Sequence, residues 1–332
     1  MINTCHLRSI SLFSSLLLCS QVYGGQWHLQ LDNDIIFGSD GNYTNGMVLG
    51  WESTAQDRRS ELPTPLQWQR LFLFNQEEGE LAWGAKLNQR MWTPAEIEIA
   101  TPQPDDRPYA GLLTIESHTA HYGVNLSQKN WLSLGVMGPL SGAQQVQEFV
   151  HKLTDSSPPL GWQYQVENQV TIQLAYEIDA LMLRRDAFNH ALTGKTQWEL
   201  SGFSHTQAGN FRTETELGVL FRWGNDLEHS FGRLSQHSGH LGNLTSAKGF
   251  SNFTFYSRAF VGYRFNDLSL EGSLPYDSHL MLEHLQYGVK SGIIWSHSNG
   301  SISWSFNSYS QEYQNDKQSW HGYGSLTFSW KL

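Results

Sequence analysis

The stretch Trp27-His28-Leu29-Gln30-Leu31-Asp32-Asn33-Asp34 alternates apolar and polar side chains with the period of a β-strand. A second strand-like run, Met47-Val48-Leu49-Gly50-Trp51, follows shortly after it. Between the two lies Phe37-Gly38-Ser39-Asp40-Gly41-Asn42, which has the composition of a turn. The pattern predicts two antiparallel strands joined by one loop.

Three oxygen-bearing side chains gather at this strand end. Asn33, Asp34 and Thr44 should lie where the two strands meet their loop. Oxygen ligands of this kind suit a hard cation such as calcium. The alternative is structural, because Asn and Asp also end strands and begin turns in proteins without a metal. The segment is not an EF-hand, since Ile36 and Tyr43 stand at two positions where that loop needs ligands.

Composition favours strands over apolar helices. The chain has 332 residues, 13% aromatic residues, 30 Gly, a formal net charge of -10 and a mean hydropathy of -0.42. Beyond the N-terminus no apolar run approaches the roughly 20 residues that a spanning helix needs. This is the profile of an outer-membrane β-barrel, although a soluble sandwich shares part of it. The acidic balance without basic clusters argues against nucleic acid as a partner.

Residues 1–24 have the features of a secretory signal peptide. A charged start and the apolar stretch from Ile10 to Leu18 precede a small-residue cleavage site. Both cysteines, Cys5 and Cys19, lie inside this segment. A mature chain of residues 25–332 would therefore contain no thiol and no disulfide.

Period-two runs recur along the rest of the chain, and we expect a single all-β domain of about twelve strands. Twelve is an even number, as bacterial barrels require. Two connections, roughly Thr54 to Gly79 and Asn225 to Asn252, are longer than ordinary periplasmic turns and count against this number. The predicted strands cover residues 27–31, 47–51, 81–91, 109–116, 131–136, 170–176, 198–203, 213–223, 254–265, 285–295, 302–310 and 321–332.

One segment has the pattern of a helix. It runs from Ser141 to Thr154, with Gly138-Pro139 before it and Pro158-Pro159 after it. Its apolar residues at helical spacing are Val146, Phe149, Val150 and Leu153. His151 lies beside this apolar stripe, which leaves two interpretations: a functional histidine or a solvated one.

Counting strands places the candidate residues at one end. If both termini lie on the periplasmic side, the loops after odd-numbered strands are extracellular. The loop near Asn33, Asp34 and Thr44 is one of these. The loop 93–108, which holds Asp105-Asp106-Arg107, and the loop 138–168, which holds His151, are the next two. Odd and even strand numbers therefore predict that Asn33, Asp34, Thr44, Arg107 and His151 lie at the extracellular end.

Several motifs together resemble the outer-membrane lipid A 3'-O-deacylases, the LpxR family. The similarity covers the mature chain in order and is densest between residues 27 and 180. The motifs that carry it are Leu31-Asp32-Asn33-Asp34, Tyr43-Thr44-Asn45-Gly46, Asp105-Asp106-Arg107-Pro108-Tyr109-Ala110-Gly111, Gly135-Val136-Met137-Gly138-Pro139, Val146-Gln147-Glu148-Phe149-Val150-His151, Gly161-Trp162-Gln163-Tyr164-Gln165 and Glu167-Asn168.

The resemblance implies a twelve-stranded barrel in the bacterial outer membrane, with a site facing outside between the wall and a loop helix. It implies calcium-dependent hydrolysis of the 3' ester of lipid A in lipopolysaccharide, among outer-membrane lipids, with release of the acyloxyacyl group. We expect the protein to be a monomer. Matched by position, the family's functional Asn, Asp, Thr and His fall on Asn33, Asp34, Thr44 and His151.

In the mechanism that follows, His151 activates water and Ca²⁺ held by Asp34 and Asn33 stabilises the oxyanion. Asp32 is a further candidate ligand, or it lines the lumen because alternation points it away from Asn33.

The chain departs from the family at one position. A lysine that some members carry in the second outer loop has no counterpart, since Pro94 to Thr101 contains no basic residue. Arg90 or Arg107 is the candidate substitute for binding a lipid phosphate. Arg107 is equally able to pair with Asp105 or Asp106.

Three other functions fit part of the pattern. A passive porin would use the same alternation, but it gives no reason for a histidine helix over the barrel end. An outer-membrane phospholipase would need a serine nucleophile paired with a strand histidine, and no such pairing stands out in the sequence. A secreted soluble β-protein would not require detergent for extraction.

Overall fold

The structure is a computed structural model that describes residues 24–34, 42–54, 64–73, 79–190, 194–244 and 251–331. The predicted signal peptide, apart from Gly24, and the turn at Ser39 and Asp40 lie outside these residues. Among the described residues, no helix is long and apolar enough to cross a bilayer.

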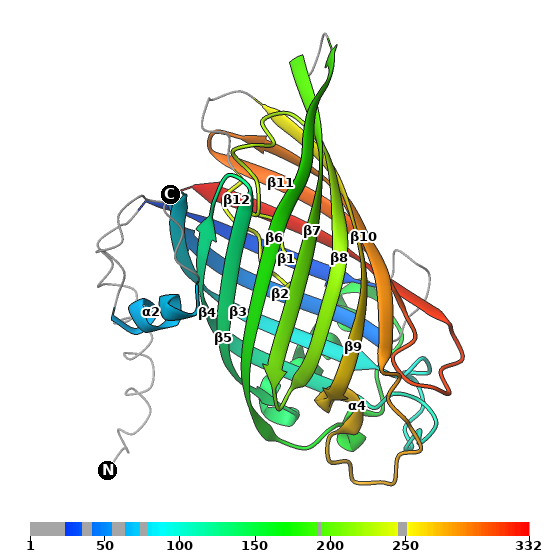
Figure 1. Cartoon of the computed structure of the whole chain (residues 1–332). Helices are drawn as coiled ribbons and strands as arrows, with labels where there is room; N and C mark the ends of the chain where they lie inside the picture. The colour runs from blue at the N-terminus through cyan, green and yellow to red at the C-terminus, as the bar shows by residue number, and fades with distance from the viewer. Residues whose placement is uncertain are drawn as a thin grey trace, which may run out of the picture.

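The described part of the chain forms a closed barrel of twelve antiparallel strands (Figure 1). Each strand pairs with its sequence neighbours, and β12 closes the barrel against β1. The predicted all-β barrel of about twelve strands is confirmed. The strands are β1 (Gly25–Asn33), β2 (Asn42–Ser53), β3 (Glu80–Thr93), β4 (Ala110–Tyr122), β5 (Leu126–Met137), β6 (Gln169–His190), β7 (Gly194–Gly209), β8 (Arg212–Gly224), β9 (Asn252–Asp267), β10 (Leu285–His297), β11 (Gly300–Ser310) and β12 (Trp320–Lys331).

The alternation read from the sequence separates the two faces of the wall, because successive strand side chains point to opposite sides. On β1, Gln26, His28, Gln30 and Asp32 are buried in the lumen, whereas Leu31 is exposed on the outside. The same division holds around the barrel, and a sheet with an apolar exterior and a polar interior suits a lipid environment. Exposed apolar side chains include Leu49, Leu87, Ile115, Leu134, Ile172, Leu217, Val261, Ile293, Trp304 and Phe328.

We call the end of the barrel where β1 begins and β12 ends the near end and the opposite one the far end. The near end holds both long connections that counted against twelve strands. The first contains α2 (Thr64–Gln69) and η2 (Arg70–Phe72). Residues 225–244 of the second, here called the inner segment, fold into the barrel instead of forming further strands. The length of these connections therefore does not contradict the strand count.

The inner segment is held by inward side chains from strands all around the barrel. These contacts are His28 Nε2 with Gly239 O at 3.2 Å, Lys86 Nζ with Ser238 O, Ser235 Oγ with Glu177 Oε2 at 2.9 Å, and Arg258 Nη2 with Leu234 O at 3.2 Å. Because His28, Lys86, Glu177 and Arg258 lie on β1, β3, β6 and β9, the inner segment crosses the lumen.

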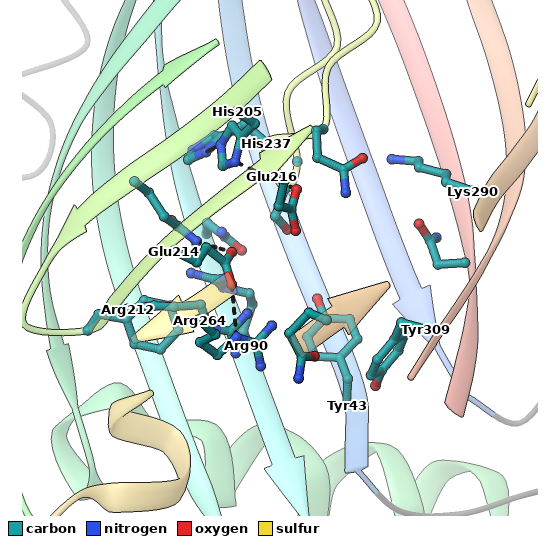
Figure 2. A pocket seen from close by; sticks show the side chains of 18 of the residues that line it. Tyr43, Arg90, His205, Arg212, Glu214, Glu216, His237, Arg264, Lys290 and Tyr309 are labelled. Carbon is teal, nitrogen blue, oxygen red and sulfur yellow. Dashed lines mark hydrogen bonds and ion pairs between the residues drawn. The ribbon is translucent and has the colours of Figure 1, made fainter. Parts of the chain in front are cut away.

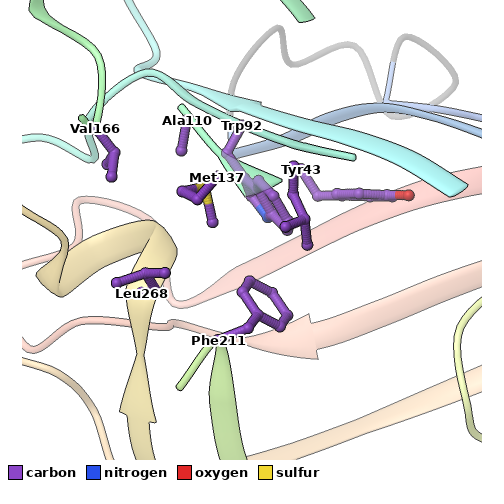
Figure 3. Close-up of a cluster of buried hydrophobic side chains, with 8 residues drawn as sticks. Tyr43, Trp92, Ala110, Met137, Val166, Phe211 and Leu268 are labelled. Atoms are coloured by element: carbon purple, nitrogen blue, oxygen red, sulfur yellow. The ribbon is translucent and has the colours of Figure 1, made fainter. Parts of the chain in front are cut away.

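Loops and short helices cover the far end: η3 (Pro139–Ser141), α3 (Ala143–Thr154), η4 (Trp162–Tyr164) and α4 (Leu268–Glu271). Beneath them an apolar cluster spans the interior from β2 to the start of α4 (Figure 3). Its buried members are Tyr43, Trp92, Ala110, Leu112, Met137, Val166, Phe211 and Leu268. This apolar cluster and the inner segment occupy opposite ends of the lumen.

Candidate functional site

A row of paired residues crosses the wall at the far end. Asn33 of β1 lies opposite Asn45 of β2, which lies opposite Met91 of β3, which in turn lies opposite Gly111 of β4. Since Asp32 points into the lumen, Asn33 points to the outer face. The row therefore leads from the predicted Asn-Asp pair to β4 across three strand spacings, roughly 14 Å.

Thr44 reaches the outer face through an irregularity in β2. The pairing of β2 with β3 shifts register between Tyr43 and Asn45, so Thr44 is the extra residue of a β-bulge. Its Oγ1 lies 2.7 Å from Oγ1 of Thr93 on β3. Thr93 follows the lumen-facing Trp92 and therefore points outward. The sequence pattern gives no sign of this bulge or of the partner.

The two neighbouring aspartates occupy different surroundings. Asp34 directly follows the end of β1 and is 1% exposed. Asp32 lines the lumen, where its carboxylate accepts hydrogen bonds from Tyr43 Oη at 2.7 Å and Gln30 Nε2 at 2.8 Å. Asp32 and Asn33 thus lie on opposite faces of β1. Asp32 is therefore on the opposite side of the wall from a metal that Asn33 would bind.

The helix α3 rests on the outer face of the same row. A Cβ added to Gly111 would lie 2.2 Å from Ser141 Oγ and 2.4 Å from Ala143 Cβ, so only glycine admits the helix this closely. Gln89 of β3 donates a hydrogen bond to Ser141 O at 2.7 Å. Ala143 packs with Met91 and Trp162 in one buried cluster. These contacts seat the start of α3 over β3 and β4.

His151 lies on the buried side of α3. It follows Gln147 by four residues and Ala143 by eight, and residues at this spacing share one face of a helix. Gln147 is 3% exposed and Ala143 is 1% exposed. His151 itself is half-buried. Its Nδ1 donates to the carbonyl of Ser157 at 2.6 Å. In the neutral ring the lone pair then lies on Nε2, where it can accept a proton.

The predicted helix is confirmed, although its apolar stripe is divided. Val146 packs against the buried cluster beneath α3. Phe149 and Leu153 are 67% and 75% exposed. A helix that turns one apolar side toward the exterior of a barrel wall suits contact with lipid.

The two arginines considered for phosphate binding are occupied inside the protein. Arg107 is fully buried and forms an ion pair with Glu312 at 2.7 Å rather than with Asp105 or Asp106. Arg90 points into the lumen, with its guanidinium 4.9 Å from the ring centre of Phe211. Their phosphate-binding roles stay predictions.

A polar cavity of about 170 Å³ lies inside the barrel between the apolar cluster and the inner segment. Figure 2 shows Arg90, Arg212 and Lys290 around it, with Glu214 and His237. Sequence reasoning did not find this cavity, because its lining comes from most of the strands. It lies on the lumen side of the wall, whereas Asn33, Thr44 and Thr93 lie on the outer side.

A second group of residues could hold a metal ion. Glu52, His118 and His240 are all buried, and one ligand atom from each lies within 4.8 Å of the other two. Figure 2 shows His237, a neighbour of His240 in the inner segment, beside the lumen wall. No sequence motif joins these three residues, because they are far apart along the chain.

A protein-family model described as "Outer membrane protein LpxR" matches residues 7–332. A comparison with curated proteins finds no match. The solved structure titled "LpxR from Salmonella typhimurium" is similar in fold, with a TM-score of 0.71, 15% identity, and coverage of 92% of this chain and 99% of that chain.

Autotransporter domains are more distantly similar. The β domain of BrkA from Bordetella has a TM-score of 0.42 at 12% identity, covering 93% of this chain and 99% of that chain. The transport unit of AIDA-I from Escherichia coli has a TM-score of 0.44 at 8% identity, covering 97% of this chain and 96% of that chain.

Proposed function

The chain belongs to the family described as outer membrane protein LpxR, and from this membership we propose that it is an outer-membrane enzyme that hydrolyses the ester at the 3' position of lipid A. The reaction releases the acyloxyacyl group from the outer leaflet. The site faces the cell exterior, and it draws its residues from Asn33, Asp34, Thr44 and His151.

One observation carries the proposal: the outer face of the wall presents Asn33, Thr44 and Thr93 at the level where α3 is seated. From Ala143 to His151 the helix rises about 12 Å, because each residue adds 1.5 Å. That rise separates His151 along the helix axis from the contact of Ala143 with Gly111. A lipid in the outer leaflet reaches this face directly from the bilayer.

His151 acts as the general base. Its Nδ1–H is committed to the carbonyl of Ser157, which fixes the ring and leaves Nε2 free to take a proton from water. The water attacks the ester carbonyl, the bond to the sugar oxygen breaks, and the proton passes to that oxygen. Thr44, held by Thr93, orients the water or the ester. No covalent intermediate is needed.

The donor set at the end of β1 fits a calcium ion. Asn33 offers an amide oxygen and Asp34 a carboxylate, and hard oxygen ligands are those that Ca²⁺ prefers. Backbone carbonyls and water would complete the shell. When bound, the ion supplies Lewis-acid stabilisation of the negative charge that develops on the ester oxygen. Asp32 is left out of this set, because it faces the lumen.

A passive porin is the alternative function, and the lumen counts against it. The inner segment crosses one end, and the apolar cluster lies across the other. A monomer is sufficient for the proposed reaction, since one chain provides all four residues.

The His151→Gln variant tests the proposal. Lipid A from a Gram-negative host that expresses the wild-type chain should lose the mass of one acyloxyacyl group in mass spectrometry. Lipid A from the host with His151→Gln should keep it, while heat-modifiable gel migration shows that the variant barrel folds. Equal lipid A spectra from the two hosts would contradict the assigned base.

A further inference from the structure

Three metal-binding side chains meet inside the near half of the barrel, on the lumen side of the wall. Glu52 comes from β2, His118 from β4 and His240 from the inner segment. Their exposed fractions are 1%, 2% and 6%. We propose that these three residues form a buried structural site for a zinc-like divalent metal, which fastens the inner segment to the wall.

The spacing of the ligand atoms fits one metal with a small adjustment. Glu52 Oε2 lies 3.1 Å from His118 Nε2 and 3.9 Å from His240 Nε2. A tetrahedral zinc with bonds near 2.1 Å places its ligand atoms roughly 3.4 Å apart. The two imidazole rings lie 4.7 Å apart at 89° and so present their nitrogens from different directions. One ligand atom from each of the three residues lies within 4.8 Å of the other two.

A purely hydrogen-bonded cluster explains only part of this arrangement. His118 can donate to Glu52, but His240 Nε2 is too far from that carboxylate for a hydrogen bond. Among the described residues, His240 Nε2 is buried without a hydrogen-bond partner. A buried polar atom of this kind is costly unless something binds it, and here it lies 3.9 Å from the Glu52 carboxylate.

Two contacts must change when the metal binds. His118 must move its ring proton from Nε2 to Nδ1 and lose its hydrogen bond to Glu52. His240 must lose the hydrogen bond that it accepts from Trp131. Trp131 Nε1–H donates to His240 Nδ1 at 3.3 Å, which places the ring proton on Nε2 in the metal-free protein. Coordination through Nε2 requires the other tautomer, with the proton on Nδ1. The contact between Trp131 and His240 is long for a hydrogen bond. We therefore expect the metal–nitrogen bond to replace it.

The ligand chemistry selects the metal class. Two imidazoles and one carboxylate suit zinc and related transition metals, whereas calcium prefers oxygen ligands only. The carboxylate is already oriented by Tyr122 Oη at 3.1 Å and by the backbone N–H of Asn243 at 3.0 Å. Supporting hydrogen bonds of this kind are usual around protein metal sites. This site is therefore distinct from the proposed calcium site in both place and chemistry.

The backbone beside His240 is shaped for this position. Gly239 has a φ of 68°, a conformation that favours glycine. A Cβ there would lie 2.7 Å from Val48 Cγ2 on β2. The inner segment thus runs against the wall at Gly239 and turns the next side chain toward Glu52 and His118. A metal at that point joins two strands to the inner segment.

Metal content of the purified full-length protein tests the site. The protein in detergent is loaded with Zn²⁺, freed of unbound metal by gel filtration, and analysed by inductively coupled plasma mass spectrometry. We expect about one zinc per chain for the wild type and close to none for His240→Gln and Glu52→Gln. The matched control is His237→Gln, which lies in the same segment but contacts Glu116 and should keep the metal.

Loading with Co²⁺ gives an independent readout. The wild type and His237→Gln should show the visible ligand-field absorption of a low-coordinate cobalt site, and His240→Gln should not. Heat-modifiable migration confirms that each variant is folded. The proposal would be overturned if the wild type retained no zinc. It would also be overturned if the wild type and His240→Gln retained equal amounts. Neither readout depends on lipid A hydrolysis.

Discussion

The side-chain oxygens of Thr44 and Thr93 lie 2.7 Å apart on neighbouring strands, on the outer face of the barrel wall. This contact exists because a β-bulge rotates Thr44 out of the inward alternation of β2. Thr93 thereby holds the hydroxyl of Thr44, which is the one that we place at the reacting ester.

Thr93→Val should lower kcat/KM by up to about tenfold, because one hydrogen bond contributes roughly 0.5–1.5 kcal/mol. Thr44→Val should lower it further, since the hydroxyl itself is lost. The control is Thr206→Val, which removes a similar pair with Thr215 at 2.9 Å on β7 and β8. Kinetics on purified lipid A measure all three. An equal loss for Thr206→Val would show that the effect is not local to the site.

Gly111→Ala should impair the enzyme without unfolding the barrel. The added methyl would stand 2.4 Å from Ala143 Cβ and displace the start of α3, and with it His151. We expect a loss of activity on the order of tenfold or more, since small misplacements at reacting groups are costly. Gly202→Ala is the control, because its methyl meets only the flexible end of Met182. If Gly111→Ala retains full activity, the seating of α3 does not position the site.

Glu312→Gln should destabilise the far end. Glu312 accepts from both Arg107 and Arg264 at 2.7 Å, and the three side chains are at most 6% exposed. Removing one member of a buried ion pair typically costs about 3–5 kcal/mol. Urea unfolding followed by heat-modifiable migration should show the loss. An unchanged midpoint would mean that the ion pair adds nothing to stability.

The Glu312 carboxylate should also make the stability of the fold depend on pH. Burial alone would raise the pKa of Glu312, but the Arg107 and Arg264 guanidiniums hold that pKa below its usual value of 4.5. The ionised carboxylate therefore stabilises the fold above pH 4.5, and this contribution is lost as the pH falls below it. The stability difference between wild type and Glu312→Gln should shrink in acid. A difference that stays constant with pH would contradict this.

The reconstituted protein should not conduct ions. The inner segment and the apolar cluster lie at opposite ends of the lumen and narrow it, and the cavity between them holds about 170 Å³. Planar-bilayer recordings with a known porin as the positive control measure this. Steady single-channel currents from the wild-type chain would favour the porin interpretation.

Much of the fold follows from local sequence patterns. The alternation at residues 27–31 and 285–295 predicts β1 and β10 because side-chain direction on a strand depends only on position. The helix at 141–154 follows from its 3.6-residue period in the same way. Parity then predicts that the loop containing His151 shares one end with Asn33.

Contacts between distant residues do not follow from such patterns. The bulge at Thr44 changes the register by one residue, and alternation alone does not reveal it. The sequence leaves Arg107 open between a lipid phosphate and Asp105 or Asp106, but in the structure it pairs with Glu312, 205 residues away. From the sequence, the inner segment is interpreted as part of a long turn between strands. Its polar side chains find their partners inside the closed barrel, and the sequence pattern does not show those contacts. Glu52, His118 and His240 are likewise joined by the fold alone.

The most direct test of the proposed function is hydrolysis of purified lipid A by the purified chain, followed by mass spectrometry. With calcium present, the wild type should release the 3'-acyloxyacyl group. With a chelator it should release none until calcium, but not zinc, is restored. Asp34→Asn should be inactive at calcium concentrations that saturate the wild type. Full activity of the wild type in chelator, or of Asp34→Asn in calcium, would contradict the assignment of a calcium-dependent deacylase.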